Sequence, residues 1–221
     1  MKLSEIKSDI PAELYSVLEK ENITELRPSQ EKSVKAGLLE GKSLLVCTPT
    51  ASGKTLIAEL ASLKSILEGK GKAIYIVPLK ALASEKFKDF KRRYEHLIKI
   101  AMSIGDLDSA DPYLHDYDLI ITTSEKFDSL IRHKAPWLDE IKVVVADEVH
   151  LLNDAGRGPT LEILLTILKQ MLKNVQIIGL SATIGNPEKL AGWLGAALVI
   201  DDWRPVALHK GIYLDGEVEF Y

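Results

Sequence analysis

The sequence has a single cysteine, few aromatic residues and no long hydrophobic run. With Cys47 alone among its 221 residues, no internal disulfide can form, and its apolar surroundings predict an inert buried thiol. No apolar run approaches the roughly 18 residues that would span a bilayer, and the N-terminus has no apolar signal region. We therefore expect a cytoplasmic protein with no membrane partner.

The chain also lacks the basic excess that commonly marks nucleic-acid binding. Its formal net charge is −4, and its composition of 46% hydrophobic and 27% charged residues is ordinary for a globular domain. The charge is uneven, because residues 80–99 contain seven Lys or Arg against three acidic residues. This basic stretch is either a solvated helix face or one wall of a positive channel.

Short apolar runs alternate with helical patterns along most of the chain. We expect strands at 44–47, 73–77, 98–103, 118–122, 143–146, 175–180 and 197–200. We expect helices at 11–20, 28–39, 56–67, 81–94, 124–131, 159–172 and 187–194, with 159–172 apolar on most sides and well buried. Strands that are apolar throughout suit burial on both faces. The pattern predicts an α/β fold, with a mostly parallel sheet, helices on both faces and ligands beyond the carboxyl ends of the strands.

The first polar motif, residues 48–55, follows an expected strand and ends in Gly-Lys-Thr at the start of a helix. This is the P-loop arrangement, in which backbone amides and a helix N-terminus favour an anion. Gly53 lets phosphate approach the backbone, Lys54 neutralises the outer phosphates, and the Thr55 hydroxyl can bind magnesium. The rest of the expected nucleotide-binding loop is Thr50, Ala51 and Ser52. Thr48 replaces the usual first glycine, and the alternative is a polar loop that only caps the helix.

The second motif is an acidic pair, Asp147 and Glu148, directly after the expected strand 143–146. Two carboxylates at the end of a buried strand are costly unless a cation or water meets them. We expect Asp147 to hold magnesium through water and Glu148 to orient and deprotonate the attacking water. The alternative is a surface pair that starts a loop. His150 is either a hydrogen-bonded core histidine or a relay between the ATP site and a second site.

Three motifs occur in a fixed order: Gly-Lys-Thr at 53–55, Asp-Glu-Val-His at 147–150 and Ser-Ala-Thr at 181–183. This set resembles the first motor domain of a superfamily 2 helicase of the DExH kind. The resemblance implies a RecA-like P-loop NTPase domain. Further similar stretches are 27–30, like the glutamine motif, 78–86, like motif Ia, and 122–126, like motif Ib, with 156–162 and 203–206 typical of the Ski-two-like group. Within that group, residues 26–214 are most similar to archaeal DNA repair helicases that act at stalled replication forks.

The resemblance assigns further roles to individual residues. Gln30 would read the adenine edge, and its alternative is a polar residue in the first turn of a helix. Ser181 and Thr183 would couple the ATP site to strand movement. The residues that would contact the nucleic-acid backbone are Lys80, Thr123 and Ser124, with Gly105 and Asp106 as further candidates. For each of these, helix capping is the structural alternative. Arg157 would pair either with the surroundings of His150 or with DNA.

The resemblance also implies how the chain is organised. Residues 1–40 would carry N-terminal helices and the adenine-reading motif, 41–203 the motor domain, and 204–221 the segment leading to a second motor domain. That second domain would supply the arginine that stabilises the transferring phosphoryl group. We therefore expect half of an ATP-dependent 3′-to-5′ DNA helicase that uses ATP and magnesium and acts on single-stranded or forked DNA. Alone, the chain would bind ATP, hydrolyse it slowly and leave duplex DNA intact.

Two other functions stay open on the motifs alone. An RNA helicase of the same group would use the same backbone-tracking motifs, and contact with the 2′-hydroxyl would distinguish it. A nucleotide-dependent switch that binds nucleic acid without translocating is the second. The sequence has no guanine-reading Asn-Lys-x-Asp and no transporter-type Leu-Ser-Gly-Gly-Gln, and it has Asp-Glu-Val-His where a DEAD-box RNA clamp has Asp-Glu-Ala-Asp.

Overall fold

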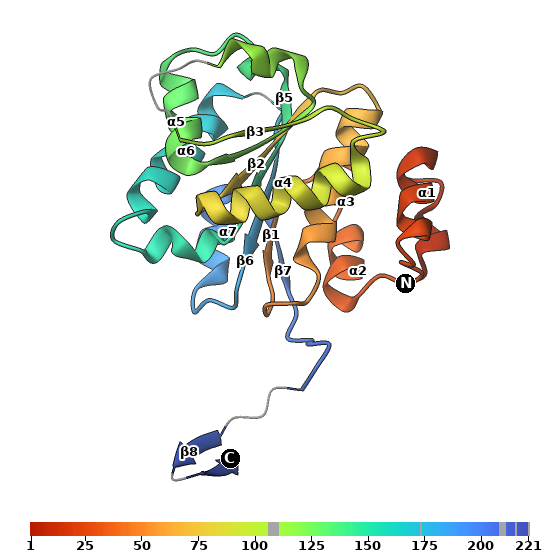
Figure 1. The fold of residues 1–221 in the computed structure, drawn as a ribbon, viewed down its shortest axis with the longest axis vertical. Helices are drawn as coiled ribbons and strands as arrows, with labels where there is room; N and C mark the ends of the chain where they lie inside the picture. Colours follow the sequence, from red (N-terminus) through yellow and green to blue (C-terminus); the bar gives the residue numbers. More distant parts are fainter. Residues whose placement is uncertain (106–110, 173, 208–210, 215, 221) are drawn as a thin grey trace.

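A seven-stranded sheet forms the centre of the computed structural model, which describes residues 1–105, 111–172, 174–207, 211–214 and 216–220 (Figure 1). The strand order is β3-β4-β2-β5-β6-β1-β7, and all neighbouring strands are parallel. The strands are β1 Leu44–Cys47, β2 Lys72–Val77, β3 Ile100–Ser103, β4 Leu119–Thr123, β5 Ile141–Ala146, β6 Gln176–Ser181 and β7 Ala197–Ile200. The predicted parallel α/β fold is confirmed.

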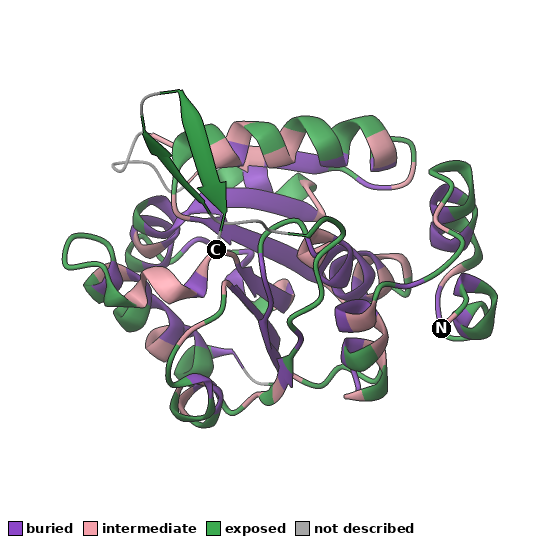
Figure 2. Ribbon diagram, turned by 90° about the horizontal axis from the view of Figure 1, so that it is seen from below, coloured by how far each residue is buried: buried purple, intermediate pink, exposed green. Residues whose placement is uncertain are grey.

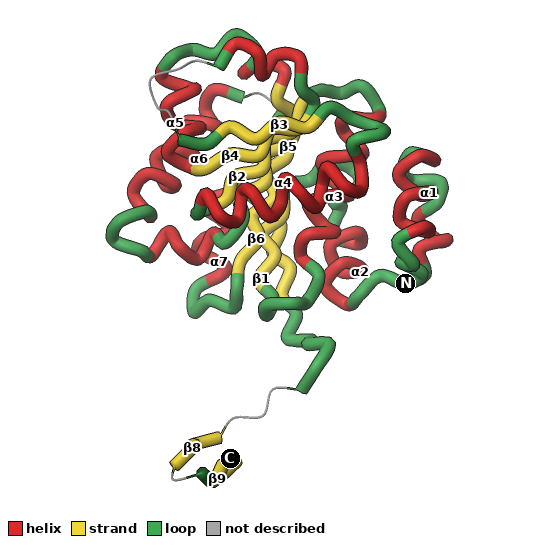
Figure 3. Tube along the Cα trace, viewed as in Figure 1, coloured by secondary structure: helices red, strands yellow, loops and turns green. Residues whose placement is uncertain are grey.

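Helices cover both faces of this sheet (Figure 3). They are α1 Ala12–Lys20, α2 Pro28–Lys35, α3 Lys54–Leu67, α4 Lys80–Tyr94, α5 Ser124–Arg132, α6 Gly158–Met171 and α7 Pro187–Leu194. Side chains of α1 to α4 belong to one hydrophobic cluster, and side chains of α5 to α7 belong to another. Successive strand residues point to opposite faces, so Leu44 and Val46 enter the first cluster while Leu45 and Cys47 enter the second. Within the described ranges, no helix has the length and apolar character needed to cross a bilayer.

The central strands are buried along their whole length, as their continuous apolar runs predict. Every residue of β1, β2, β4 and β6 is buried, which Figure 2 shows as the purple centre of the molecule. Strand β7 differs, because it lies at the edge of the sheet and pairs only with β1. Of its residues, only Val199 is buried.

Two helices differ from the prediction. The helix expected over 28–39 ends at Lys35, because Gly37 has a φ of 101°, in a region that a right-handed helix does not enter. Helix α6 was expected to be buried on most sides, and this is wrong: Ile163 is 53% and Met171 44% exposed. Its buried leucines, Leu161, Leu164, Leu165 and Leu168, follow the spacing of a single helix face.

A hairpin near the C-terminus was not predicted from the sequence. Strands β8 Gly211–Leu214 and β9 Glu217–Phe220 pair antiparallel, form a separate sheet and are exposed at every residue (Figure 1). The alternation Glu-Val-Glu-Phe at 217–220 after an Asp-Gly pair is a hairpin pattern that could have predicted it.

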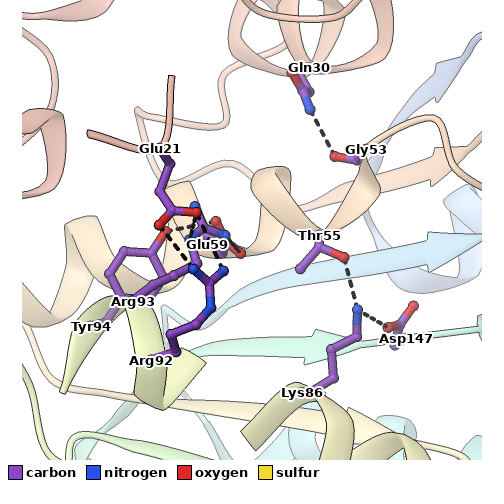
Figure 4. Close-up of polar contacts among 10 residues, drawn as sticks. All are labelled: Glu21, Gln30, Gly53, Thr55, Glu59, Lys86, Arg92, Arg93, Tyr94 and Asp147. Carbon is purple, nitrogen blue, oxygen red and sulfur yellow. Dashed lines mark hydrogen bonds and ion pairs between the residues drawn. The ribbon is translucent and has the colours of Figure 1, made fainter. Parts of the chain in front are cut away.

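A buried ion pair joins α3 to α4 (Figure 4). Glu59 of α3 is only 2% exposed; its carboxylate accepts from Arg93 Nη1 at 2.6 Å and from the Tyr94 hydroxyl at 2.8 Å. Burial raises the pKa of Glu59, and the Arg93 charge opposes that rise. Arg93 therefore supplies the charge that Glu59 needs, and the pair fixes α4 against the helix that starts at the 48–55 loop.

Replacing Arg93 with Met is expected to destabilise the domain strongly, because it leaves the Glu59 carboxylate buried without a counterion. The expected loss is about 3–5 kcal/mol in the free energy of unfolding, measured by urea denaturation. The matched control is Arg92→Met, which removes a 63% exposed arginine paired with Glu21 and should cost about 0–1 kcal/mol. Equal losses in the two variants would show that the buried Glu59–Arg93 pair contributes no more to the free energy of unfolding than an exposed pair.

Candidate functional site

The three motifs named from the sequence meet at one edge of the sheet. Strands β5, β6 and β1 are consecutive in the sheet order, and each runs directly into one motif. Residues 147–150 follow β5, residues 181–183 lie at the end of β6, and residues 48–55 follow β1. Parallel strands place their carboxyl ends on the same edge, so the motifs converge where a doubly wound fold binds its ligands.

The 48–55 loop wraps around the side chain of Lys54. Lys54 Nζ donates to the Ser181 carbonyl at 2.9 Å and to the Thr48 carbonyl at 3.3 Å. The side-chain oxygens of Thr48 and Ser52 lie 2.7 Å apart and are buried. The Thr48 amide also donates to the Ser181 carbonyl at 3.2 Å, so the backbone of Ser181 contacts the loop directly.

Gly53 is required at its position for two reasons. Its φ of 92° lies in the left-handed region, and a Cβ there would lie 2.5 Å from Gln30 Nε2. Ala51 in the same loop also has a positive φ, 62°. Left-handed residues within a tight loop turn backbone amides toward one point, as an anion-binding loop needs.

Gln30, predicted to read adenine, makes two contacts with backbone in this structure. Its Oε1 accepts from the Arg27 amide at 2.8 Å, and its Nε2 donates to the Gly53 carbonyl at 2.9 Å (Figure 4). The Arg27 guanidinium donates to the Ala51 carbonyl at 2.8 Å. Both residues therefore tie the start of α2 to the phosphate-binding loop. Adenine reading by Gln30 stays a prediction, and it would exchange one of these hydrogen bonds for a bond to the base.

Asp147 lies opposite Thr55, and a lysine ammonium lies between them (Figure 4). Lys86 Nζ donates to Thr55 Oγ1 at 2.9 Å and lies 4.0 Å from Asp147 Oδ2. The same Oδ2 accepts from the Tyr75 hydroxyl at 2.9 Å. Burial and the neighbouring Asp147 raise the pKa of Tyr75, which keeps its hydroxyl a neutral donor.

These groups fit magnesium. Hydroxyl and carboxylate oxygens are the hard ligands that magnesium prefers, and the Lys86 ammonium is a stand-in cation between them. The part of the chain that the structure describes contains no cluster of three or more His, Cys, Asp or Glu side chains that could hold a metal ion. Thr55 would bind the ion directly and Asp147 would hold it through water, with phosphate oxygens and further water completing the shell, as is usual for magnesium in nucleotide sites.

Glu148 has a strained backbone, with φ 55° and ψ 43°. A non-glycine residue in this left-handed region costs about 1–3 kcal/mol, and such residues cluster at functional sites. His150 Nδ1 lies 3.3 Å from Glu148 Oε2 and 3.3 Å from the Ala182 amide nitrogen. One nitrogen cannot accept from the amide and donate to the carboxylate at once, so its tautomer decides which bond forms. His150 thus lies between the acidic pair and residues 181–183, and its relay role stays a prediction.

Two adjoining cavities surround these groups. One, of about 410 Å³, is lined by the phosphate-binding loop, Lys86 and the acidic pair. The other, of about 480 Å³, extends past Gln30 to residues 22–25. Their shared lining residues are Arg27, Gly53, Thr55 and Lys86. This shape suits a nucleotide whose phosphates lie at the loop and whose base lies beside Gln30. Thr183 lies elsewhere, with His150 on a third cavity of about 560 Å³.

The residues predicted to contact nucleic acid have mixed surroundings. Lys80 is exposed at the start of α4. Thr123 and Ser124 are 4% and 6% exposed, and Thr123 Oγ1 caps α5 by accepting from the Lys126 amide at 3.4 Å. The observed contact of Thr123 is thus the capping alternative, and nucleic-acid contact stays a prediction for all three. Gly105 has a φ of 103°, and Asp106 lies outside the described residues.

Four of the seven basic side chains in residues 80–99 contact acidic or polar groups of the domain itself. Lys86 faces Thr55 and Asp147, Arg93 pairs with Glu59, and Arg92 and Lys91 pair with Glu21 and Glu95. These pairs leave less free positive charge for a nucleic-acid channel than the sequence suggested. The Arg157 side chain has no ion pair among the described residues, and its amide donates to Asp154 Oδ1 at 2.9 Å.

Three residues of the site were not assigned roles from the sequence: Arg27, Tyr75 and Lys86. Arg27 and Lys86 lie inside stretches that carry the family resemblance. Tyr75 is the single hydroxyl-bearing residue within the apolar run 73–77. A tyrosine hydroxyl needs a hydrogen-bond partner when it is buried, as Tyr75 is. Its partner, Asp147, lies directly after the neighbouring strand β5.

The fold and the motor motifs define a helicase-type nucleotide-binding domain, and comparison with known proteins agrees. A family model described as DEAD/DEAH box helicase matches residues 27–190. The chain belongs to this family. Among solved structures, a crystal structure of the DUF1998 helicase MrfA bound to DNA superposes with a TM-score of 0.73 at 28% identity, covering 88% of this chain and 30% of that one.

Individual relatives are more similar in sequence. The chain is 52% identical over 218 residues to the ATP-dependent DNA helicase Hel308 of Pyrococcus horikoshii, covering 99% of this chain and 30% of that protein. It is 56% identical over 214 residues to Hel308 of Methanocaldococcus jannaschii, covering 94% of this chain and 18% of that protein. The predicted similarity to archaeal DNA helicases is confirmed, and the chain spans less than a third of the length of these two relatives.

Proposed function

We propose that this chain is the ATP-binding motor domain of an ATP-dependent DNA helicase. One observation carries the proposal: at the ends of β1 and β5, Lys54, Thr55 and Asp147 converge on one cavity. The similarity to proteins named ATP-dependent DNA helicase, over 99% of the chain in one case, supports DNA as the substrate.

Each residue of the site would have a separate role in binding and hydrolysing ATP. Lys54 would leave the Thr48 and Ser181 carbonyls and bind the outer phosphates of ATP. Glu148 would accept the proton of the attacking water, and Asp147 and Thr55 would hold magnesium. Magnesium, when bound, neutralises charge on the phosphate oxygens. In this step the Ser181 carbonyl, at the end of β6, would lose its hydrogen bond from Lys54. Nucleotide binding would thereby change the contacts of residues 181–183, which include Ser181 and Thr183.

The proposal includes two partners. The first is a second motor domain, whose arginine would stabilise the charge on the transferring phosphoryl group and complete the active site. The second is single-stranded or forked DNA, tracked from 3′ to 5′, with Lys80, Thr123 and Ser124 near its backbone. The predicted division at residues 40 and 203 belongs to the same proposal. Replication-fork repair would be the setting of this activity.

ATP turnover by the 221-residue chain tests the proposal. We expect magnesium-dependent ATP binding with slow turnover, measured with and without single-stranded DNA and with Lys54→Ala as the blank. A folded chain that binds no nucleotide would refute the proposed function. Fast, DNA-stimulated turnover would show instead that the chain completes its active site without a second motor domain. A matched RNA oligomer that competes better than DNA would favour the RNA helicase alternative.

A further inference from the structure

Lys86 is the one residue of α4 whose charged group lies at the proposed metal ligands. Its ammonium is 2.9 Å from Thr55 Oγ1 and 4.0 Å from Asp147 Oδ2 (Figure 4). It also lies 5.9 Å from the centre of the Tyr75 ring. Its side chain is 16% exposed, so water screens these contacts only in part. Lys86 therefore occupies the place between a hydroxyl and a carboxylate that a bound cation would take.

The ammonium and a magnesium ion cannot share this place. Magnesium binds its oxygen ligands at about 2.0–2.1 Å in a nearly octahedral shell, and Lys86 Nζ already approaches the same Thr55 oxygen. Two positive charges a few ångströms apart repel strongly in a partly buried site. Binding of magnesium with nucleotide must therefore move Lys86 away from Thr55.

A destination for the displaced side chain is close by. Lys86 lines the same 480 Å³ cavity as Glu59 and Asp89. Its charge acts on Glu59 already: burial raises the pKa of Glu59, and the charges of Arg93 and Lys86 oppose that rise. A rotation of the flexible lysine chain toward these two carboxylates would keep its charge compensated, without any change in α4.

We propose that Lys86 is a placeholder cation, which holds Thr55 and Asp147 together in the nucleotide-free domain and is displaced when magnesium enters with the nucleotide. The inference rests on the proposed nucleotide-binding function. It assigns Lys86 a positioning role that opposes magnesium, in contrast to Lys54, which binds the phosphates together with magnesium. Without magnesium, the Lys86 ammonium can attract the phosphates of a nucleotide. With magnesium present, the ammonium competes with the ion for the place between Thr55 and Asp147.

The test is the magnesium dependence of ADP binding by the full 221-residue chain. The Kd for ADP is measured by calorimetry in EDTA and in saturating magnesium. The quantity compared between variants is the ratio of the Kd in EDTA to the Kd in magnesium. Lys86→Met removes the charge and keeps the side-chain length. We expect it to weaken binding in EDTA and strengthen it in magnesium, so that the ratio rises about tenfold. Lys88→Met, an exposed neighbour with the same charge change, should leave the ratio at its wild-type value.

Other outcomes have definite meanings. An unchanged ratio in Lys86→Met would overturn the inference, because a merely structural lysine shifts both Kd values alike. A lower ratio would also overturn it, since Lys86 would then stay beside magnesium as a phosphate ligand. Lys86→Arg keeps the charge and should retain a ratio near the wild-type value. If Lys86→Met does not fold, judged by its thermal transition, Lys86→Gln takes its place with the same expectation.

The wild-type measurement separates this inference from the proposed function. Failure of the wild-type chain to bind ADP in either condition would refute the nucleotide site, and the Lys86 inference with it. Binding by the wild type, with a ratio that Lys86→Met does not raise, would refute the Lys86 inference alone.

Discussion

Replacing Lys54 with Ala is expected to weaken magnesium-ADP binding by about a hundredfold or more. Lys54 is the only residue of the 48–55 loop with a cationic side chain, and its two present acceptors are backbone carbonyls that a phosphate can replace. Each hydrogen bond between charged groups contributes about 1.5–3 kcal/mol, so the loss of two such bonds accounts for this factor. Calorimetric titration of the purified variant with magnesium-ADP measures it.

The control for Lys54→Ala must separate charge from folding. Lys70→Ala removes an exposed lysine just beyond the other end of α3, where it pairs with Glu68, and should bind as the wild type does. A thermal transition close to that of the wild type would show that Lys54→Ala is folded. Undiminished ADP binding by a folded Lys54→Ala would mean that the 48–55 loop does not hold the phosphates.

Replacing Glu148 with Gln is expected to lower ATP turnover by about 10²–10⁴-fold while leaving ATP binding within about threefold of wild type. Gln has nearly the same shape but cannot accept the proton of the attacking water. Gln and Glu are identical up to the terminal group, so we expect the left-handed backbone at residue 148 and the direction of the side chain to be kept. Single-turnover hydrolysis, in a protein that contains both motor domains, separates the chemical step from binding.

Glu188→Gln is the matched control for Glu148→Gln. It makes the same chemical change at an exposed residue in the first turn of α7 that does not line the cavity of the phosphate-binding loop, and it should turn over ATP at the wild-type rate. Unchanged turnover in Glu148→Gln would exclude Glu148 as the base. Weak ATP binding in that variant would point instead to a role in holding the nucleotide.

Most of the fold could be predicted because parallel strands buried on both faces leave continuous apolar runs. Strand β1 matches its predicted bounds, and the ends of β4 and β6 differ by one residue. Helix ends were harder, since they depend on single residues such as Gly37, where the chain leaves the helical region. The burial of α6 was misjudged because the helix has apolar residues on more than the one face that packs against the domain. Ile163 lies outside that face and is exposed.

The site could be predicted only motif by motif. Lys54, Thr55 and Asp147 were each found from local pattern, because a loop and an acidic pair at strand ends have a chemical meaning on their own. Lys86 could not be placed, since its contact with Thr55 depends on how α4 packs against α3. Tyr75 and Asp147 are 72 residues apart and meet because β2 and β5 are neighbours, a pairing that no local pattern indicates.

The strand order has a consequence for how the protein is synthesised. Strand β1, which carries the phosphate-binding loop, pairs with β6 and β7, the last two strands of the sheet to be translated. At about 5–20 residues per second, a ribosome needs roughly 7 to 27 seconds to pass from the end of β1 to the end of β6. During that time the nascent loop lacks the Ser181 carbonyl that binds Lys54. The nucleotide pocket therefore cannot close before β6 has been translated, and a chain stalled before β6 leaves the apolar β1 strand without either of its neighbours in the sheet.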